Sequence, residues 1–324
     1  MEFTIRIWSQ HRLGNLGNLG NLALATLVVW SSLGGLAQAQ AVSVLPPPTK
    51  QLLSQTAADS GCNPQLVDCA HRGLRFAWSE QPIPYLVSPR RTRMLNSRPL
   101  IRWLPVAGAS QYTITVTGEG LEWQAQTPDT QLPYSGAPLE PGGEYRVIIE
   151  TDTGASSLDE PSHPGGIAFA VVTVSEREAI AAQAQVLGED VGAIAQLYLD
   201  NGLLAEGIAQ LEMLWAQQRA SQLPNSQIAL HLGNLYFEQL LLPTLARNWY
   251  ETALVQTETL DPREQALALA QLGHVWAVMH DSERAIAYWQ QAQQVYAALG
   301  DASQVQRLQD YIEEEQELLG RLQQ

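Results

Sequence analysis

"LGHVWAVMHDSERAIAYWQQA", residues 272–292, repeats the order of small and large residues found in "LGNLYFEQLLLPTLARNWYETAL", residues 232–254. Both stretches place an aromatic residue three positions after a glycine and a second one four positions after an alanine. Small residues let two helices approach closely, and large residues fill the space beside them. The stretches therefore predict two helical hairpins of the same design. The aligned pairs are Leu232 and Leu272, Gly233 and Gly273, Tyr236 and Trp276, Ala246 and Ala285, Tyr250 and Trp289, and Ala253 and Ala292.

A weaker third copy lies upstream and aligns Ala195 with the two glycines, so the copies are spaced by 38 and then 40 residues. A helix over 303–323 with a polar, glutamate-rich face is predicted to cap the C-terminal end of the array, and a helix over 176–187 is a candidate cap for the other end. The pattern thus predicts a helical array from 176 to 324. The residues of the third copy are Ile194, Ala195, Tyr198, Gly207, Leu211 and Leu214.

This order of small and large positions resembles the tetratricopeptide repeat, a helix–turn–helix unit of about 34 residues. The resemblance covers residues 188–300 and is carried mainly by the last two copies. It implies an α-solenoid whose stacked hairpins share one core. The sequence departs from the family pattern at three points: the first copy lacks the glycine, the second has an extra residue near "LLLP", and no proline closes the copy after Ala292.

The resemblance also implies a function. In tetratricopeptide repeats the first helix of each unit lines a concave groove that binds a protein or peptide, and Asn234 stands where family members often bond a ligand backbone. Leu230 and Ala270 occupy positions where a carboxylate-clamping lysine would be, so a basic or extended apolar segment is the expected partner. The alternative is that these side chains are merely exposed. The implied partner-binding residues are Gln196, Asp200, Asn234, Phe237, Glu238, His274 and Val278.

The sequence from 97 to 175 changes to a period of two. "QYTITVTG" alternates Tyr112, Ile114 and Val116 with threonines, and further short runs follow at about ten-residue intervals between Gly, Pro and Asp. Such spacing indicates a β-sandwich. The segment resembles a fibronectin type III-like domain, which implies an all-β, Ig/fibronectin-like sandwich before the all-α solenoid in a multidomain chain. The residues that carry the resemblance are Trp103, Pro105, Tyr112, Leu139, Pro141 and Tyr145.

The N-terminus predicts export. Basic residues precede the apolar run 21–37, and "AQA" at 37–39 has the small-x-small pattern of a cleavage site. Residues 1–39 are therefore predicted to be a signal peptide, with the mature chain beginning near Gln40 or Ala41 in the periplasm or outside the cell. The alternative is a membrane anchor, although the apolar run is shorter than the ~20 residues that a spanning helix needs.

Residues 40–96 are rich in Pro, Ser and Gln and predict a linker. Cys62 and Cys69 are the only cysteines. In an exported chain an even number of cysteines favours a disulfide, whereas zinc binding with His71 would leave an incomplete ligand set. Five arginines near the end of this segment favour a solvated linker face, and the alternative is a patch that docks an acidic partner, including the chain's own acidic C-terminal half. They are Arg90, Arg91, Arg93, Arg98 and Arg102.

Two helix starts are predicted from capping patterns. Ser175-Glu-Arg-Glu178 has the residues of a capping box, and Asp261-Pro-Arg-Glu264 repeats it with proline at the first helical position. Charge is unevenly divided between the two halves. Residues 176–324 contain 20 acidic residues and 7 arginines, a balance of −13, whereas residues 40–175 contain 12 acidic and 9 basic residues, a balance of −3.

Composition and motifs restrict the function. A net charge of −15 excludes general attraction to nucleic acid or anionic lipid. The sequence has no HExxH zinc motif, Gly-x-Ser-x-Gly elbow or phosphate loop. We therefore expect no enzyme activity and no cofactor. The predicted function is a protein-binding scaffold in the cell envelope. The alternative is a sensor or accessory module whose sandwich binds glycan or peptide while the helical array mediates oligomerisation.

Overall fold

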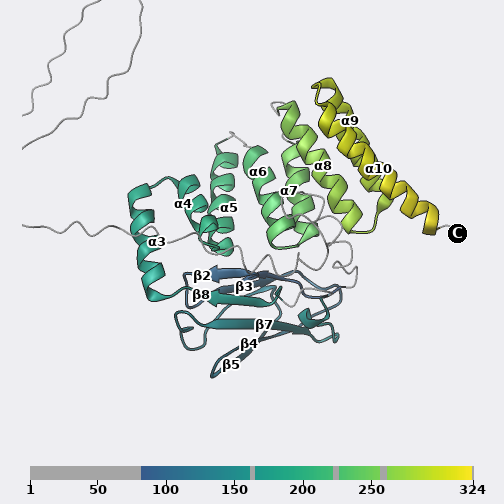
Figure 1. The fold of residues 1–324 in the computed structure, drawn as a ribbon. Helices are drawn as coiled ribbons and strands as arrows, with labels where there is room; N and C mark the ends of the chain where they lie inside the picture. The colour runs from purple at the N-terminus through teal and green to yellow at the C-terminus, as the bar shows by residue number, and fades with distance from the viewer. Residues whose placement is uncertain (1–81, 161–164, 222–225, 256–260, 323–324) are drawn as a thin grey trace, which may run out of the picture. The chain divides into compact units, whose positions relative to one another are not determined.

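A β-sheet region precedes an α-helical region in the computed structural model, which describes residues 82–322 except 161–164, 222–225 and 256–260 (Figure 1). The prediction of a β region followed by helical repeats is confirmed in this form. The fibronectin-like and tetratricopeptide assignments stay predictions. The predicted signal peptide 1–39, the linker up to residue 81, and the pair Cys62 and Cys69 lie outside the described residues.

The described residues of the β region form two sheets. One has the order β1-β3-β6, and the other has the order β2-β8-β7-β4-β5, in which β2 and β8 pair in parallel. Side chains from both sheets, including Ile101 and Trp103 from β3 and Ile114 and Val147 from β4 and β7, form one buried cluster. The strands are β1 (Leu86–Ser88), β2 (Thr92–Met94), β3 (Leu100–Trp103), β4 (Tyr112–Gly118), β5 (Leu121–Thr127), β6 (Gln131–Pro133), β7 (Glu144–Thr151) and β8 (Ala168–Val171).

Strand β4 follows the predicted alternation. Tyr112, Ile114 and Val116 are buried in the shared core, and the threonines between them are half-buried on the other face. The linker prediction is wrong for residues 82–96, because β1 and β2 lie there and contribute Leu86 and Met94 to the same core.

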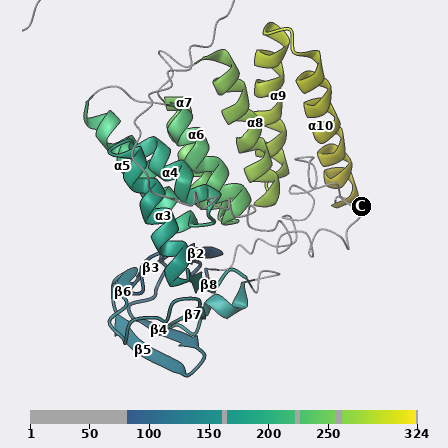
Figure 2. The same cartoon turned by 60° about the vertical axis from the view of Figure 1, so that its left-hand side comes forward.

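The helical region consists of consecutive helices, of which α4 packs on α5, α6 on α7 and α8 on α9, while α10 packs on α9 (Figures 1 and 2). Their bounds are α3 (Val174–Leu187), α4 (Val191–Asp200), α5 (Leu204–Ala220), α6 (Ser226–Asn234), the π-helical turn η3 (Leu235–Gln239), α7 (Pro243–Val255), α8 (Pro262–Val278), α9 (Ser282–Ala298) and α10 (Ala302–Leu322); a short 3₁₀ turn, η2 (Ser157–Asp159), precedes β8.

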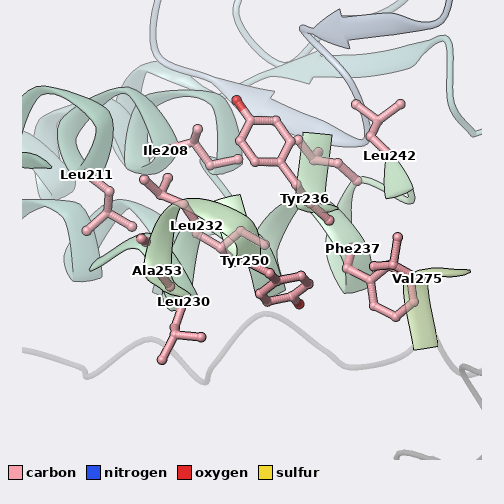
Figure 3. Close-up of a cluster of buried hydrophobic side chains, with 14 of the residues drawn as sticks. Ile208, Leu211, Leu230, Leu232, Tyr236, Phe237, Leu242, Tyr250, Ala253 and Val275 are labelled. Carbon is pink, nitrogen blue, oxygen red and sulfur yellow. The ribbon is translucent and has the colours of Figure 1, made fainter. Parts of the chain in front are cut away.

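The aligned glycines make room for aromatic rings. A Cβ at Gly233 would collide with the Tyr250 ring, and a Cβ at Gly273 would collide with the Trp289 ring. Tyr250 and Trp289 are completely buried, and Figure 3 shows Tyr250 in the core of its hairpin. Within each hairpin, a recurring small position is therefore in contact with a recurring large one.

The extra residue near "LLLP" is absorbed by a change in helix geometry. The Leu240 N–H bonds to the Leu235 carbonyl at 3.0 Å, five residues back, which is the π-helical pattern. Leu241 then adopts a positive φ of 55°. The insertion thus ends α6 in a π turn before α7 begins.

One of the two predicted helix caps is wrong. Helix α3 is capped by Thr173 and Glu176, two residues earlier than the predicted Ser175 and Glu178, because the Thr173 hydroxyl accepts the Glu176 N–H. The start of α8 is confirmed: Asp261 accepts the Arg263 N–H at 2.8 Å, with proline at the first helical position.

Candidate functional site

The predicted partner-binding residues differ in exposure along the array. At the position directly after the aligned small residue, Gln196 is exposed, Asn234 is half-buried and His274 is only 5% exposed. Four positions further on, Asp200 and Glu238 are exposed, whereas Val278 is 1% exposed. Equivalent positions are therefore open to solvent in α4 and buried in α8.

The exposed members are polar and acidic. The Gln196 side-chain amide donates to the Asp200 carboxylate at 2.8 Å, one turn away on α4. Glu238 lies in the π turn, where partial desolvation raises the pKa of its carboxyl group above the ordinary value. These side chains can accept hydrogen bonds from, and pair with, a positively charged segment.

Asn234 is engaged within the protein. Its side-chain oxygen accepts the Tyr250 hydroxyl at 2.8 Å and the Gln271 amide at 3.3 Å. This oxygen links α6 with α7 and α8. The role implied for Asn234, bonding a ligand backbone, would leave only its amide N–H groups for the ligand.

Phe237 and Val278 lie in the interior, so the prediction that a partner touches them directly is wrong for this arrangement. Both belong to a buried cluster that also contains Tyr250 and Val275, and Figure 3 shows Phe237 beside Val275. The reason is that α6 and α8 each pack on more than one neighbouring helix, so the side taken as exposed is partly covered.

His274 is also buried, which corrects its predicted place on the surface. Its ring packs edge-on against Trp289 at 5.4 Å and Tyr311 at 4.9 Å between ring centres. Burial, with a smaller contribution from the positive charge of Arg307, lowers the pKa of His274 to about 4. The imidazole is therefore neutral at neutral pH.

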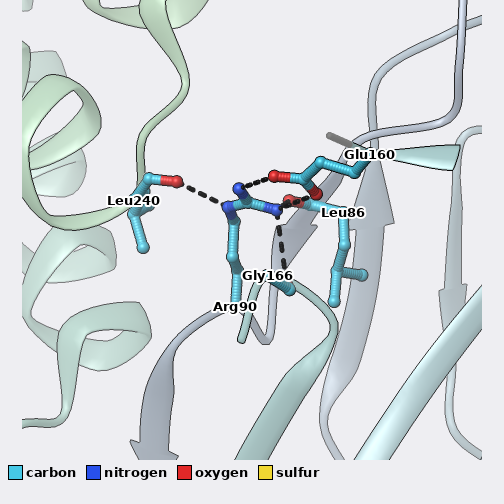
Figure 4. A network of polar contacts seen from close by, with 5 residues as sticks. All are labelled: Leu86, Arg90, Glu160, Gly166 and Leu240. Atoms are coloured by element: carbon cyan, nitrogen blue, oxygen red, sulfur yellow. Dashed lines mark hydrogen bonds and ion pairs between the residues drawn. The ribbon is translucent and has the colours of Figure 1, made fainter. Parts of the chain in front are cut away.

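A second polar site, which the sequence did not predict, joins the β region to the helices. The Arg90 guanidinium is buried and binds both carboxylate oxygens of Glu160, at 2.9 and 2.5 Å (Figure 4). Its Nε donates to the Leu240 carbonyl at 2.5 Å, at the end of the π turn, and one Nη donates to the Gly166 carbonyl at 3.3 Å. Arg90 thus connects two segments of the β region with η3.

Two further arginines of the basic cluster reach acidic residues on helices. Arg93 pairs with Glu176 of α3 at 2.6 Å, and Arg102 approaches Glu212 of α5 at 3.9 Å. Hydrogen bonds from Arg93 and Thr173 lower the pKa of Glu176 to about 2. The favoured interpretation of this cluster as a solvated linker face is wrong for these residues, and the alternative, docking onto the chain's own acidic half, describes them.

Within the described ranges, no group of three or more His, Cys, Asp or Glu side chains is arranged to hold a metal ion. In the same part of the chain, no helix is long and apolar enough to cross a membrane. The absence of enzyme activity and of a cofactor stays a prediction.

Comparisons with known proteins identify no family. No family model matches the sequence, and no curated protein matches it. Fourteen chains of solved structures match the fold search. One of them is the crystal structure of MamA, which is 18% identical, covers 44% of this chain and 90% of its own, and superposes with a TM-score of 0.28.

Proposed function

We propose that this protein is a non-enzymatic scaffold that binds a basic protein segment through the first helices of a tetratricopeptide-type array. The observation that carries the proposal is the exposure of Asp200 and Glu238 at equivalent positions of α4 and η3. The array is assembled from hairpins with the small–large pairing of that family, and its sequence carries a charge balance of −13. Charge complementarity steers a basic partner toward such a face.

The proposed location is the cell envelope or the exterior, because residues 1–39 have the composition of a signal peptide. The β region, proposed to be fibronectin-like, would then act as a spacer. It supports the array directly, since Arg90 binds the Leu240 carbonyl and Arg93 pairs with Glu176.

The experiment begins with capture of partners from an envelope extract by the full chain. Each captured protein is then purified and its affinity is measured against the double variant Asp200→Asn with Glu238→Gln. We expect at least a tenfold loss of affinity, because two exposed charges are removed from the proposed interface. Binding of the unmodified chain should also weaken as salt is raised.

The matched control is Glu313→Gln with Glu317→Gln, which removes two exposed charges from the outer face of α10. It changes the net charge equally and should leave affinity nearly unchanged. Equal losses in the two double variants would show that only overall charge matters. Full affinity in the Asp200 and Glu238 variant would contradict the proposed face and direct attention to the β region.

A further inference from the structure

Three of the four sheet edges in the described β region are protected against pairing with a further strand. The edge strands are β1 and β6 of one sheet and β2 and β5 of the other. Strand β1 has three residues and an irregular register, and β6 has three residues and ends at Pro133, which has no N–H to donate. Strand β2 lies against the helices, where the Arg93 N–H donates to the Gly202 carbonyl at 3.0 Å.

The fourth edge, β5, has none of these protections. It pairs with β4 over all seven of its residues in a continuous register, and no other described strand pairs with it. It contains no proline, glycine or basic residue, and Glu122 carries its single charge. It lies at the end of its sheet opposite β2, and therefore away from the helices (Figures 1 and 2). An edge of this length and composition is a template for another strand.

The hairpin with β4 determines which backbone groups of β5 face outward. A two-residue turn, 119–120, joins the strands, and Gly118 and Leu121 form the closing pair. The closing pair of such a hairpin exchanges two hydrogen bonds, and hydrogen-bonded pairs alternate along an antiparallel ladder. The odd-numbered residues of β5 therefore bond to β4 as Leu121 does. The backbone N–H and C=O groups that face away from β4 belong to Glu122, Gln124 and Gln126.

These three residues are complementary to the same three residues of a second, antiparallel copy. When Gln124 lies opposite Gln124 of the other copy, all three pair, and Glu122 lies opposite Gln126 on both sides of the centre. On the opposite face of the sheet, Trp123 then lies opposite Ala125, so a large side chain meets a small one.

Other registers of the same two strands are unfavourable. A register centred on Glu122 places two carboxylates together, and one centred on Trp123 places two indoles opposite each other. A register centred on Ala125 brings Glu122 to Pro128, which has no N–H to donate. The sequence of β5 therefore selects a second copy of itself in one register.

We propose that β5 pairs with β5 of a second copy of this chain, antiparallel and centred on Gln124, so that two five-stranded sheets join into one. The contact is isologous, with the same strand contributed by each copy. The Gln126 amide donates one N–H to the Thr113 hydroxyl at 3.1 Å and has a second N–H for Glu122 of the other copy. Because a contact of seven residues is small, the dimer dissociates on dilution. The surface lies outside the first helices of the array, so the inference is independent of the proposed function.

Cysteine substitution in the full chain tests the register. Opposite Cα atoms of a hydrogen-bonded antiparallel pair are about 5.5 Å apart, which is within the range that a disulfide spans. Gln124→Cys should therefore link residue 124 of two copies on mild oxidation. Mass spectrometry of the linked peptides distinguishes this bond from any bond made by Cys62 or Cys69.

Glu122→Cys and Gln126→Cys are the matched controls on the same strand. In the proposed dimer each of these positions lies four residues, about 13 Å, from its own copy, so we expect about tenfold less self-linking than in Gln124→Cys. Mixing the two control variants should restore a link, joining residue 122 to residue 126. Equal self-linking at all three positions would indicate random collision and overturn the proposal, as would a mixture that gives no 122–126 link.

A second measurement needs no cross-link. Sedimentation velocity of the unmodified chain should show a dimer whose fraction increases with concentration. Gln124→Pro removes the central outward N–H and should abolish the dimer, whereas Gln124→Thr retains that N–H and should preserve it. An unmodified chain that stays monomeric, or a dimer that persists in Gln124→Pro, would contradict pairing through β5. Partner capture plays no part in either readout, so failure here and failure of the proposed scaffold function are distinguishable.

Discussion

The hairpin α6–α7 and the hairpin α8–α9 share one packing rule and differ in their neighbours. Both place a glycine against a buried ring, Gly233 against Tyr250 and Gly273 against Trp289. The first hairpin ends its leading helix in a π turn that receives a hydrogen bond from the β region. In the second, the leading helix is regular and its second half is buried on every side.

This difference separates two kinds of information in the sequence. The small–large pairing is a local property of each hairpin, so it recurs wherever the pattern recurs. The exposure of a side chain depends on what lies beside the helix. The same position therefore holds a half-buried Asn234 in one hairpin and an interior His274 in the next.

The largest effect is expected from removing the contact that distinguishes the first hairpin. Arg90→Met leaves the Glu160 carboxylate, whose side chain is 3% exposed, without its buried cation. Breaking a buried ion pair in this way costs about 3–5 kcal/mol. We expect a corresponding loss in the free energy of unfolding by urea titration, with faster amide exchange in η3 than in α8.

The control is the double variant Arg90→Met with Glu160→Gln, which removes both charges. Its unfolding free energy should recover part of the loss, because no unpaired charge remains buried. Equal stability of the single and double variants would show that the Arg90 contact to the Leu240 carbonyl, rather than the ion pair, stabilises the junction.

The next effect tests the rule that the two hairpins share. In Gly273→Ala, the added methyl group meets a ring that cannot move freely, since the Trp289 indole N–H is bonded to the Ala270 carbonyl at 3.2 Å. Overpacking of this kind costs about 1–3 kcal/mol, and we expect the upper end of that range in thermal or urea unfolding. Gly320→Ala is the control, because no atom lies within 4 Å of a Cβ there.

The upstream copy supplies a rescue for this variant. It has Ala195 and Leu211 at the positions of the glycine and the ring. Gly273→Ala with Trp289→Leu reproduces that pair and should be less destabilised than the sum of the two single variants. Strict additivity of the two losses would refute the small–large pairing as the reason for the glycine.

These pairs also show how far sequence reasoning can go. The alternation in β4 and the recurring small and large positions of the hairpins were predictable, because spacing along the chain sets which side chains share a face. Which ring meets which glycine was not predicted, because the two lie on different helices. The contact of Arg90 with Glu160 was not predictable either, because the partners are 70 residues apart and neither has a distinctive local pattern. The burial of His274 was missed because no periodicity within α8 reports what covers that helix.

The third-largest effect is the pH dependence of stability caused by His274. Asn234 holds the equivalent position in the first hairpin and does not titrate. Because the pKa of His274 is about 4 in the folded protein and about 6.5 when unfolded, the unfolded state binds more protons between these values. This contribution is fully present above pH 6.5 and decreases as pH falls. We expect a loss of about 2 kcal/mol from pH 7 to pH 5.

His274→Gln should reduce this pH dependence, which unfolding titrations at several pH values would measure. A variant whose stability still falls as steeply over the same interval would assign the dependence to other groups, such as the imidazole of His231, whose pKa is also lowered by burial.

The smallest effect is expected at Arg93. Like Arg90, it connects the β region with the helices, but it is less buried. Arg93 and Glu176 are each about one-third exposed, whereas Arg90 is fully buried. Glu176 has a folded pKa of about 2 against an ordinary 4.5, so its contribution is present above pH 4.5 and is lost as pH falls toward 2.

Solvent screens an exposed pair, which limits its contribution to about 1 kcal/mol or less. Arg93→Gln should therefore raise the pKa of Glu176 in an NMR titration yet lower stability at pH 7 by only about 0.5 kcal/mol. Thr173→Ala, which removes the hydroxyl bonded to the same carboxylate, separates the contribution of the helix cap. A loss in Arg93→Gln as large as that in Arg90→Met would mean that connection to the helices, and not burial of the charge, determines how much each arginine stabilises the junction.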